Sequence, residues 1–324
     1  DNINEVYPTY YPPRKTPKEC YEQIIADLTD AEQYAPDNDN SDRTKMTKTV
    51  AQAMLAKVYA EKEVQDYDKV IAYADKVMNT TGVELEDSYE TLWGYDETAK
   101  DCMKRNTKEG ILEVHWTTGS GNWETWMYGR QLDNWDYNFT WAKWITPSRD
   151  IINDFDKEGD EVRKNQAIVY YACTWSNYYP ASNYPFMYKL RSSYNNIYWV
   201  RLADIILMKA EAEAYKGNLA ESAKLVNQIR KRAKLKELTS DKTGSKESMI
   251  EAVLHERRLE LAFEGERWFD LCRNNKVEKY LNGIDNRDSG RIRQVKQFDS
   301  NSYLLPIPQT ALDQNTNLEQ NPGY

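Results

Sequence analysis

The sequence of 324 residues has few of the residue types from which common catalytic and metal-binding sites are built. Its only histidines are His115 and His255, and neither has a partner at the spacing of a catalytic triad or a metal site. The four cysteines are scattered without a C-x-x-C pair, which argues against structural zinc. The G-x-S-x-G, Walker and G-x-G-x-x-G motifs are also missing. We therefore expect no metal, no cofactor and no catalytic residue, which excludes most hydrolase and nucleotide chemistry.

Long runs of one kind of residue are missing as well. No apolar stretch reaches the roughly 18 residues that a membrane-spanning helix needs, and no long basic run is present. With 43 Lys and Arg against 52 Asp and Glu, the formal net charge is −9. This balance argues against nucleic acid or anionic lipid as a partner, and it favours neutral or cationic ligands.

What the sequence does contain is small residues at the spacing of packed helices. In the segment 201–235, Ala210, Ala212 and Ala214 precede Gly217, and Val226 and Ile229 return at helical spacing after the turn. The segment 54–78 has a similar arrangement without the glycine turn, and a 34-residue period is not kept between the two. This pattern predicts an all-α fold with embedded tetratricopeptide-like hairpins. Helices are expected at about 17–35, 45–61, 66–79, 199–216, 220–233 and 246–264.

The middle of the chain differs in composition. Nine of the ten Trp and twelve of the 24 Tyr fall within 88–199, among Gly, Asn and Ser residues. This composition predicts long irregular loops with a few short strands, such as 110–116. We expect one domain, 1–324, with a helical hairpin part at 17–80, an aromatic-rich loop region at 88–199, and a second hairpin part with a tail at 200–324. The tail after Asn274 is expected to pack across the helices.

The densest aromatic cluster, 122–144, combines indole and phenol rings with amide, carboxylate and guanidinium groups. A pyranose ring has an apolar C–H face that lies on an aromatic ring, while its hydroxyls need polar partners, so the cluster is typical of a sugar-binding platform. The alternative is that the rings fill a small core under a long loop. The second aromatic group, 175–188, has the further alternative of a protein contact. The candidate ligand-binding residues are Trp123, Trp126, Tyr128, Arg130, Asn134, Trp135, Tyr137, Trp141, Trp175 and Tyr178.

Two acidic patterns suggest chemistry but favour a structural interpretation. Asp154-x-Asp156-x-Glu158-Gly159 begins like a calcium-binding loop, but its twelfth position is Asn165 in place of a bidentate Glu. A solvated acidic turn after a helix at 147–155 is therefore preferred. In 255–273, carboxylates and arginines recur one turn apart, as with Glu260 and Glu264. Glycoside hydrolysis needs two carboxylates facing each other across about 5 to 10 Å. Ion pairs that hold the helical repeats together are the preferred interpretation.

Several segments resemble, in the same order, the SusD/RagB family of nutrient-binding lipoproteins of Bacteroidetes outer membranes. The segment 20–31, CYEQIIADLTDA, is similar to the family's helix that ends in Asp-Leu-x-x-Ala, and 43–59 resembles the start of its alanine-rich hairpin. The segments 144–163, 201–235 and 255–273 continue the series. The segment 304–324, with Pro-Ile-Pro and a final Asn-Pro-Gly-Tyr, is similar to the family's terminal signature.

The resemblance implies a non-catalytic cell-surface lipoprotein of the outer membrane, which binds an oligosaccharide and delivers it to a TonB-dependent transporter of the SusC type. A RagB-like protein that binds peptides is the alternative within this class, and a carboxylate-dependent helical glycosidase is the alternative of another class. Family members usually carry a signal sequence, an acylated cysteine and a long helical region before the segment that matches 20–31. The start of this chain resembles none of these, so we expect membrane contact only through an N-terminal lipid anchor that this chain lacks.

Overall fold

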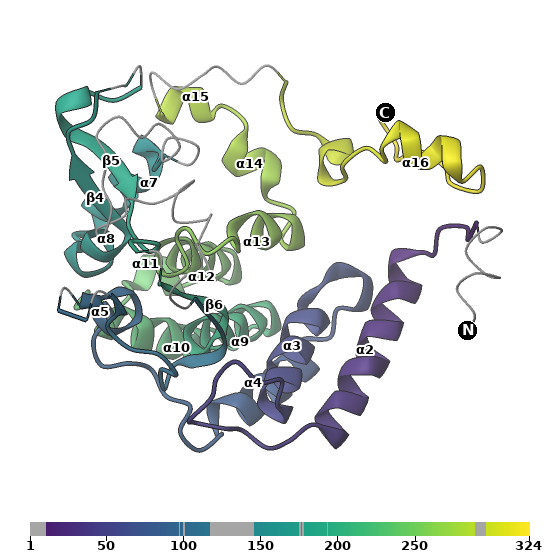
Figure 1. Ribbon diagram of the computed structural model, residues 1–324, viewed down its shortest axis with the longest axis horizontal. Coiled ribbons are helices and arrows are strands. Elements are labelled where there is room, and N and C mark those ends of the chain that lie inside the picture. The colour runs from purple at the N-terminus through teal and green to yellow at the C-terminus, as the bar shows by residue number, and fades with distance from the viewer. Residues whose placement is uncertain are drawn as a thin grey trace.

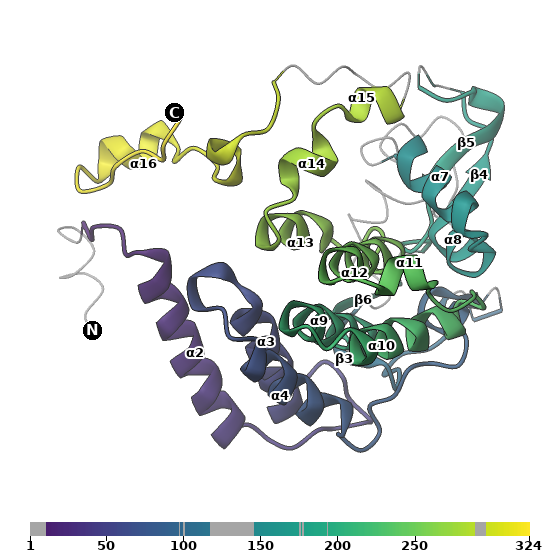
Figure 2. The same cartoon turned by 180° about the vertical axis from the view of Figure 1, so that it is seen from behind.

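A computed structural model describes residues 11–96, 98–99, 101–116, 146–174, 176, 178–192, 194–288 and 296–324 of the chain. Helices dominate this part of the chain, as the sequence predicts. The helices of the N-terminal and central parts pack side by side, while short strands and further helices lie toward the opposite end (Figures 1 and 2). None of the helices in the described ranges is both long and apolar enough to cross a membrane.

The N-terminal part consists of three packed helices. Thr16 caps α2 and forms a reciprocal capping box with Glu19, while Pro17 occupies a first-turn position that needs no N–H donor. Helix α3 packs between α2 and α4, and Asp66 caps the start of α4. These helices lie close to those predicted at 17–35, 45–61 and 66–79. Their bounds are α2 (Pro17–Tyr34), α3 (Lys48–Ala60), the 3₁₀ turn η2 (Lys62–Val64) and α4 (Tyr67–Met78).

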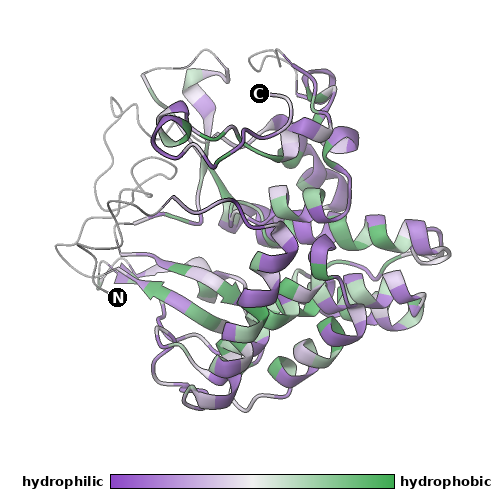
Figure 3. Cartoon of the chain, turned by 90° about the vertical axis from the view of Figure 1, so that its right-hand side faces the viewer, coloured by the Kyte–Doolittle hydropathy of each residue, from purple (hydrophilic) through white to green (hydrophobic). Residues whose placement is uncertain are grey.

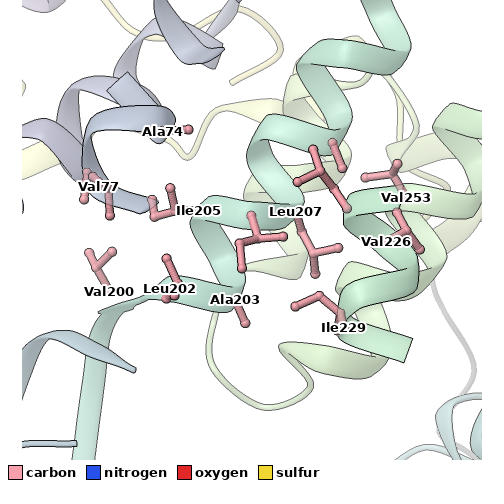
Figure 4. Packing of buried hydrophobic residues seen from close by; sticks show 14 of the residues in the cluster. Ala74, Val77, Val200, Leu202, Ala203, Ile205, Leu207, Val226, Ile229 and Val253 are labelled. Atoms are coloured by element: carbon pink, nitrogen blue, oxygen red, sulfur yellow. The ribbon is translucent and has the colours of Figure 1, made fainter. Parts of the chain in front are cut away.

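Helix α9 (Leu202–Lys216) is the centre of the core. Every residue from Leu202 to Ala214 is buried, because α9 contacts α3 and α4 on one side and α10 (Leu219–Arg232) and α12 (Lys246–Glu260) on the other. Ala210, Ala212 and Ala214 have no exposed surface, so the neighbouring backbones approach closely. Leu207, Val226, Ile229 and Val253 meet between α9, α10 and α12 (Figure 4). Hydrophobic residues are concentrated along these central helices and on the strands beside them (Figure 3).

The predicted turn between α9 and α10 is confirmed. Gly217 ends α9 with φ of +86°, and the N–H groups of Gly217 and Asn218 donate to the carbonyls of Ala214 and Glu213. Glycine adopts this left-handed conformation without a steric penalty, which explains its position after the helix.

The start of α9 differs from the prediction of a helix beginning at residue 199. Residues Asn196–Arg201 form strand β6, which pairs antiparallel with β3 (Gly110–His115), and α9 begins only at Leu202. Arg201 keeps an extended backbone as the N-cap residue of α9. The aromatic and β-branched residues of 196–201 form a strand because β3 is available as a pairing partner. Strand β3 itself confirms the predicted strand at 110–116.

The remaining elements of the central region are short. Strand β4 pairs antiparallel with β5, β1 pairs with β2, and α7 and α8 lie next to β4. Their bounds are α5 (Glu90–Trp93), β1 (Tyr95–Asp96), β2 (Asp101–Cys102), α7 (Arg149–Glu158), α8 (Glu161–Ala167), β4 (Ile168–Tyr171), η4 (Ala181–Asn183) and β5 (Tyr184–Met187).

The predicted tail, from residue 275 on, packs against the helices as far as Tyr303, whose ring contacts that of Trp268. The guanidinium of Arg267 lies over the ring of Tyr280. The backbone N–H of Arg149, on α7, donates a hydrogen bond to the carboxylate of Asp288. The last residues lie beside the start of the described chain, where Asn315 donates to the Pro12 carbonyl (Figures 1 and 2). The elements after α10, apart from α12, are α11 (Ser240–Thr243), α13 (Arg267–Arg273), α14 (Val277–Leu281), α15 (Ile284–Arg287), η5 (Ser300–Tyr303) and α16 (Gln309–Gln314).

Candidate functional site

Nine of the ten predicted ligand-binding residues lie outside the described residues. They are Trp123, Trp126, Tyr128, Arg130, Asn134, Trp135, Tyr137, Trp141 and Trp175. The description stops at Trp116, after β3, and resumes at Thr146, before α7. The predicted sugar platform is therefore a segment whose two attachment points belong to the scaffold.

Both attachment points are held by side-chain hydrogen bonds. Arg105 donates to the Trp116 carbonyl (2.9 Å) and is paired with Asp101. At the other end, the hydroxyl groups of Thr146 and Tyr184 lie 2.6 Å apart. The β3–β6 and β4–β5 sheets thus fix where the aromatic segment leaves and re-enters the scaffold.

Tyr178, the remaining predicted residue, is part of a packed cluster. Its phenol oxygen lies 2.5 Å from the buried carboxylate of Asp288, and its ring meets that of Tyr179 edge to face. The guanidinium of Arg149 lies over both rings, 4.5 Å and 4.1 Å from their centroids. Because the Tyr178 hydroxyl already bonds Asp288, this geometry favours the loop-packing alternative for the second aromatic group.

The scaffold behind these loops is joined by buried ion pairs. Glu260 is fully buried on α12 and accepts from Arg201 at 2.7 Å, from Arg163 at 3.2 Å and from Arg232. Burial alone would raise the pKa of Glu260, but the three guanidiniums hold it well below its usual value. Arg201 also bonds Glu109, which precedes β3. A single charge cluster therefore connects α8, α10, α12 and the N-cap of α9 to Glu109, just before the strand that leads to the aromatic segment.

A second buried cluster joins α3, α9, α12 and α13. Arg257 bonds Asp204 (2.8 Å) and Asp270 (2.9 Å), and Lys57 bonds Asp204 (2.7 Å) from α3. Arg273 extends the cluster to another carboxylate of α9. These contacts support the interpretation that arginines hold the repeats together. Most of the partners nevertheless come from different elements. Asp270 and Arg273 of α13 do pair within one helix (2.8 Å), whereas Arg257 pairs with carboxylates outside α12 and not with Glu260.

The calcium-like segment also has cationic partners. Asp154 bonds Arg258, Asp156 bonds Lys164, and Glu158 bonds both Arg230 (3.0 Å) and His255 (3.2 Å). Gly159 ends α7 in the left-handed conformation, with φ of +68°. The three carboxylates therefore take part in ion pairs, and the segment is the acidic C-terminal end of α7.

One cavity was not anticipated from the sequence. It has a volume of about 480 Å³ and lies between β6, Trp93 of α5 and the turn that joins α12 to α13. Its aromatic lining is Trp93, Tyr198, Phe263 and Trp268. Trp268 is partly buried, and its ring contacts Phe298 and Tyr303. It lies on α13, a short helix separate from α12, which ends at Glu260.

The helical hairpins and the buried arginine clusters define a helical-repeat scaffold. A model of the SusD family matches residues 31–324, and the chain belongs to this family. SusD-family proteins are non-catalytic binding proteins. The SusD-like protein P2 of Formosa agariphila is 28% identical over 351 aligned positions, which cover 96% of this chain and 66% of that relative. The chain thus spans slightly less than two thirds of the relative's length.

Solved structures share the fold. A SusD-like protein from Bacteroides fragilis superposes with a TM-score of 0.74 at 22% identity, covering 98% of this chain and 73% of that one. A laminarin-binding SusD-like protein superposes with a TM-score of 0.70 at 24% identity, covering 96% of this chain and 70% of that one. These likenesses confirm the predicted all-α, SusD-like fold.

Proposed function

We propose that this chain forms most of a nutrient-binding protein that holds an oligosaccharide without altering it. The observation that carries the proposal is the match of residues 31–324 to the SusD family. The laminarin-binding protein of the same fold supports a glycan as the ligand class. The composition of the segment 122–144 supports it independently, because indole rings next to amides and carboxylates suit the two faces of a sugar ring.

The proposed site comprises the aromatic segment held at Trp116 and Thr146. Trp123, Trp126, Trp135 and Trp141 are proposed as stacking surfaces, and Arg130 and Asn134 as partners for hydroxyl groups. In this proposal the ion-paired helices position the segment, and the polar groups of the segment select the ligand.

Two alternatives to glycan binding are a peptide-binding function and a glycosidase activity. A RagB-like peptide-binding function would use the same aromatic segment and stays an alternative. A glycosidase would need two accessible carboxylates, but Glu256 and Glu260 are fully buried and bonded to arginines. These two residues are therefore unsuitable as an acid and base pair.

We further propose that the protein works at the outer-membrane surface, as a lid that delivers ligand to a SusC-like TonB-dependent transporter. This rests on family membership alone. Affinity purification of the protein from outer membranes under mild detergent should recover a TonB-dependent barrel protein. Recovery only as a free periplasmic protein, under conditions that preserve comparable complexes, would contradict it.

Ligand class is tested by calorimetry with laminarin oligosaccharides and with peptides of similar mass. We expect glycan binding that persists at high salt, because stacking on neutral sugars is little affected by screening. After prolonged incubation the glycan should show no new reducing ends. Binding of peptides alone would favour the RagB-like alternative, and release of reducing ends would favour the glycosidase.

A further inference from the structure

The cavity between β6 and the α12–α13 turn has the size and lining of a small-molecule site. Its volume of about 480 Å³ falls within the range of about 300–1,000 Å³ that is common for ligand pockets. Apart from the aromatic rings, Leu190, Ile197 and Leu261 contribute apolar surface. A flat apolar group can therefore be buried there.

Most of the polar groups in its wall already have partners. Lys189 Nζ bonds Glu264 at 2.6 Å and the Glu260 carbonyl at 3.1 Å, and Asn196 Nδ2 donates to a carbonyl at 2.7 Å. The carboxylate of Asp270 is taken up by Arg257. A sugar bound there would bury several hydroxyl groups that find no hydrogen-bond partner in the wall, and each unpaired hydroxyl would cost binding free energy. The cavity is thus poorly suited to a neutral glycan.

Arg267 is the exception among the charged groups of the wall. Among the described residues its one hydrogen-bond acceptor is the Leu254 carbonyl (3.1 Å), and it forms no ion pair with a carboxylate there. Its guanidinium lies over the Tyr280 ring, 4.7 Å from the centroid. Burial and, less strongly, Arg258 lower the pKa of Arg267 to about 10, against the opposing effects of Asp270, Tyr280 and Asp154. An anion bound beside Arg267 would stabilise its charged form.

Two other nitrogens of wall residues, Trp93 Nε1 and Arg257 Nη2, have no well-oriented hydrogen-bond acceptor in the described ranges, but they have almost no accessible surface and so do not face a ligand in the cavity. Among the described residues of the wall, Arg267 is therefore the cation without a carboxylate partner. The carboxylates of the wall, Glu264 and Asp270, are neutralised by other cations. The missing component is an acceptor, and a negative charge fits best.

We propose that this cavity binds a small carboxylate with a flat apolar body, such as an aromatic carboxylic acid. The ring would be buried among Trp93, Tyr198 and Trp268, and the carboxylate would pair with the free guanidinium donors of Arg267. The residues named for this cavity differ from those proposed for the glycan site, so the two sites are distinguishable by substitution.

The test uses the full chain with phenylacetate as the probe and phenylacetamide as its uncharged isostere, by calorimetry. Phenylacetate should bind at millimolar or lower concentration, and about tenfold more tightly than the amide, because a charge-assisted hydrogen bond is worth at least that factor. Arg267→Gln should remove the preference for the acid, whereas Arg267→Lys should restore part of it. Lys231→Gln, which removes an exposed cation of α10 outside the cavity, should leave both affinities unchanged.

If Arg267→Gln fails to fold, three measurements on other variants and probes test the same site. Phenylacetate should quench tryptophan fluorescence, and Trp268→Leu should weaken binding of both probes equally because it removes ring contact and not charge. Methyl glucuronide, which has the charge on a polar ring, should bind more weakly than phenylacetate. Equal affinity for acid and amide, no binding of phenylacetate, or tighter binding of the glucuronide would each overturn the proposal.

Discussion

Arg201 and Glu260 are bonded at 2.7 Å in the fully buried interior, where the start of α9 meets the end of α12. The two residues are far apart in the chain, yet they form the centre of the ion-pair cluster that joins the helical scaffold to Glu109, just before β3. Removing one partner of a buried ion pair leaves the other charge uncompensated. This lowers the free energy of unfolding by far more than an exposed ion pair contributes.

The first prediction tests this cluster. Glu260→Gln leaves Arg163, Arg201 and Arg232 without their shared carboxylate, and should lower the free energy of unfolding by about 3–5 kcal/mol. Glu22→Gln is the control, since Glu22 forms an exposed pair with Lys18 and should change stability by less than about 1 kcal/mol. Urea denaturation followed by circular dichroism measures both. Similar small losses in the two variants would contradict the structural role of the cluster.

The second prediction concerns pH. The hydrogen bond from His255 and then Arg230 lower the pKa of Glu158 to about 2, against the opposing effect of burial. Because the folded-state pKa lies below the usual value of 4.5, this contribution to stability is fully present above that pH and is lost as pH falls toward 2. Glu158→Gln should therefore flatten the fall in urea midpoint over this range.

The matched control for Glu158 is Glu221→Gln, at a partly exposed residue of α10 whose ion-pair partner among the described residues is Lys224. Its urea midpoint should follow the wild-type pH dependence. A Glu158→Gln profile that is parallel to wild type between pH 4.5 and 2 would contradict the assigned pKa.

The third prediction concerns the α9–α10 turn. Gly217→Ala should destabilise the protein by about 1–2 kcal/mol, because φ is +86° and an L-residue incurs that penalty in the left-handed region. A Cβ added at this position would have no other atom within 4 Å, so the loss is a backbone effect and not a clash. Gly217→Asn should lose less, since Asn tolerates this conformation better. Equal loss for Ala and Asn would contradict the assignment.

The fourth prediction places the glycan. Alanine at Trp123, Trp126, Trp135 or Trp141 should remove about 1–3 kcal/mol of binding to a confirmed glycan while the melting temperature stays near wild type. Tyr34→Ala, which removes a 75% exposed ring at the end of α2, should change neither quantity. If all four variants unfold, or if affinity is unaffected, the segment is a packing element and the proposed site is wrong.

Trp268 gives the comparison for a ring outside that segment. Because it is only partly buried, Trp268→Ala should cost less stability than the roughly 3–5 kcal/mol expected for a fully buried ring, and it should leave glycan affinity unchanged. Thermal denaturation and calorimetry distinguish the two effects. If Trp268→Ala lost glycan affinity, the cavity would be part of the glycan site.

The helices could be predicted because their signals are local. The small residues of α9, the glycine after it and the capping residues of α2 and α4 each act within a few positions, and the structure places these elements within a few residues of the expected bounds. Strand β6 was missed because a strand needs a partner, and its partner β3 lies more than eighty residues earlier. Tyr178 was identified by composition, which does not reveal its bond to Asp288.

The sequence by itself determined the all-α class, the hairpins and the family, because periodicity, turn residues and ordered motifs are properties of the chain alone. Only the tertiary structure decided which charges meet. Glu260 pairs with three arginines from α8, α10 and the start of α9, and Arg267 is left without a carboxylate in the described part of the chain. Spacing along one helix predicts neighbours on that helix, whereas a buried charge takes the partners that the packing of other elements brings to it.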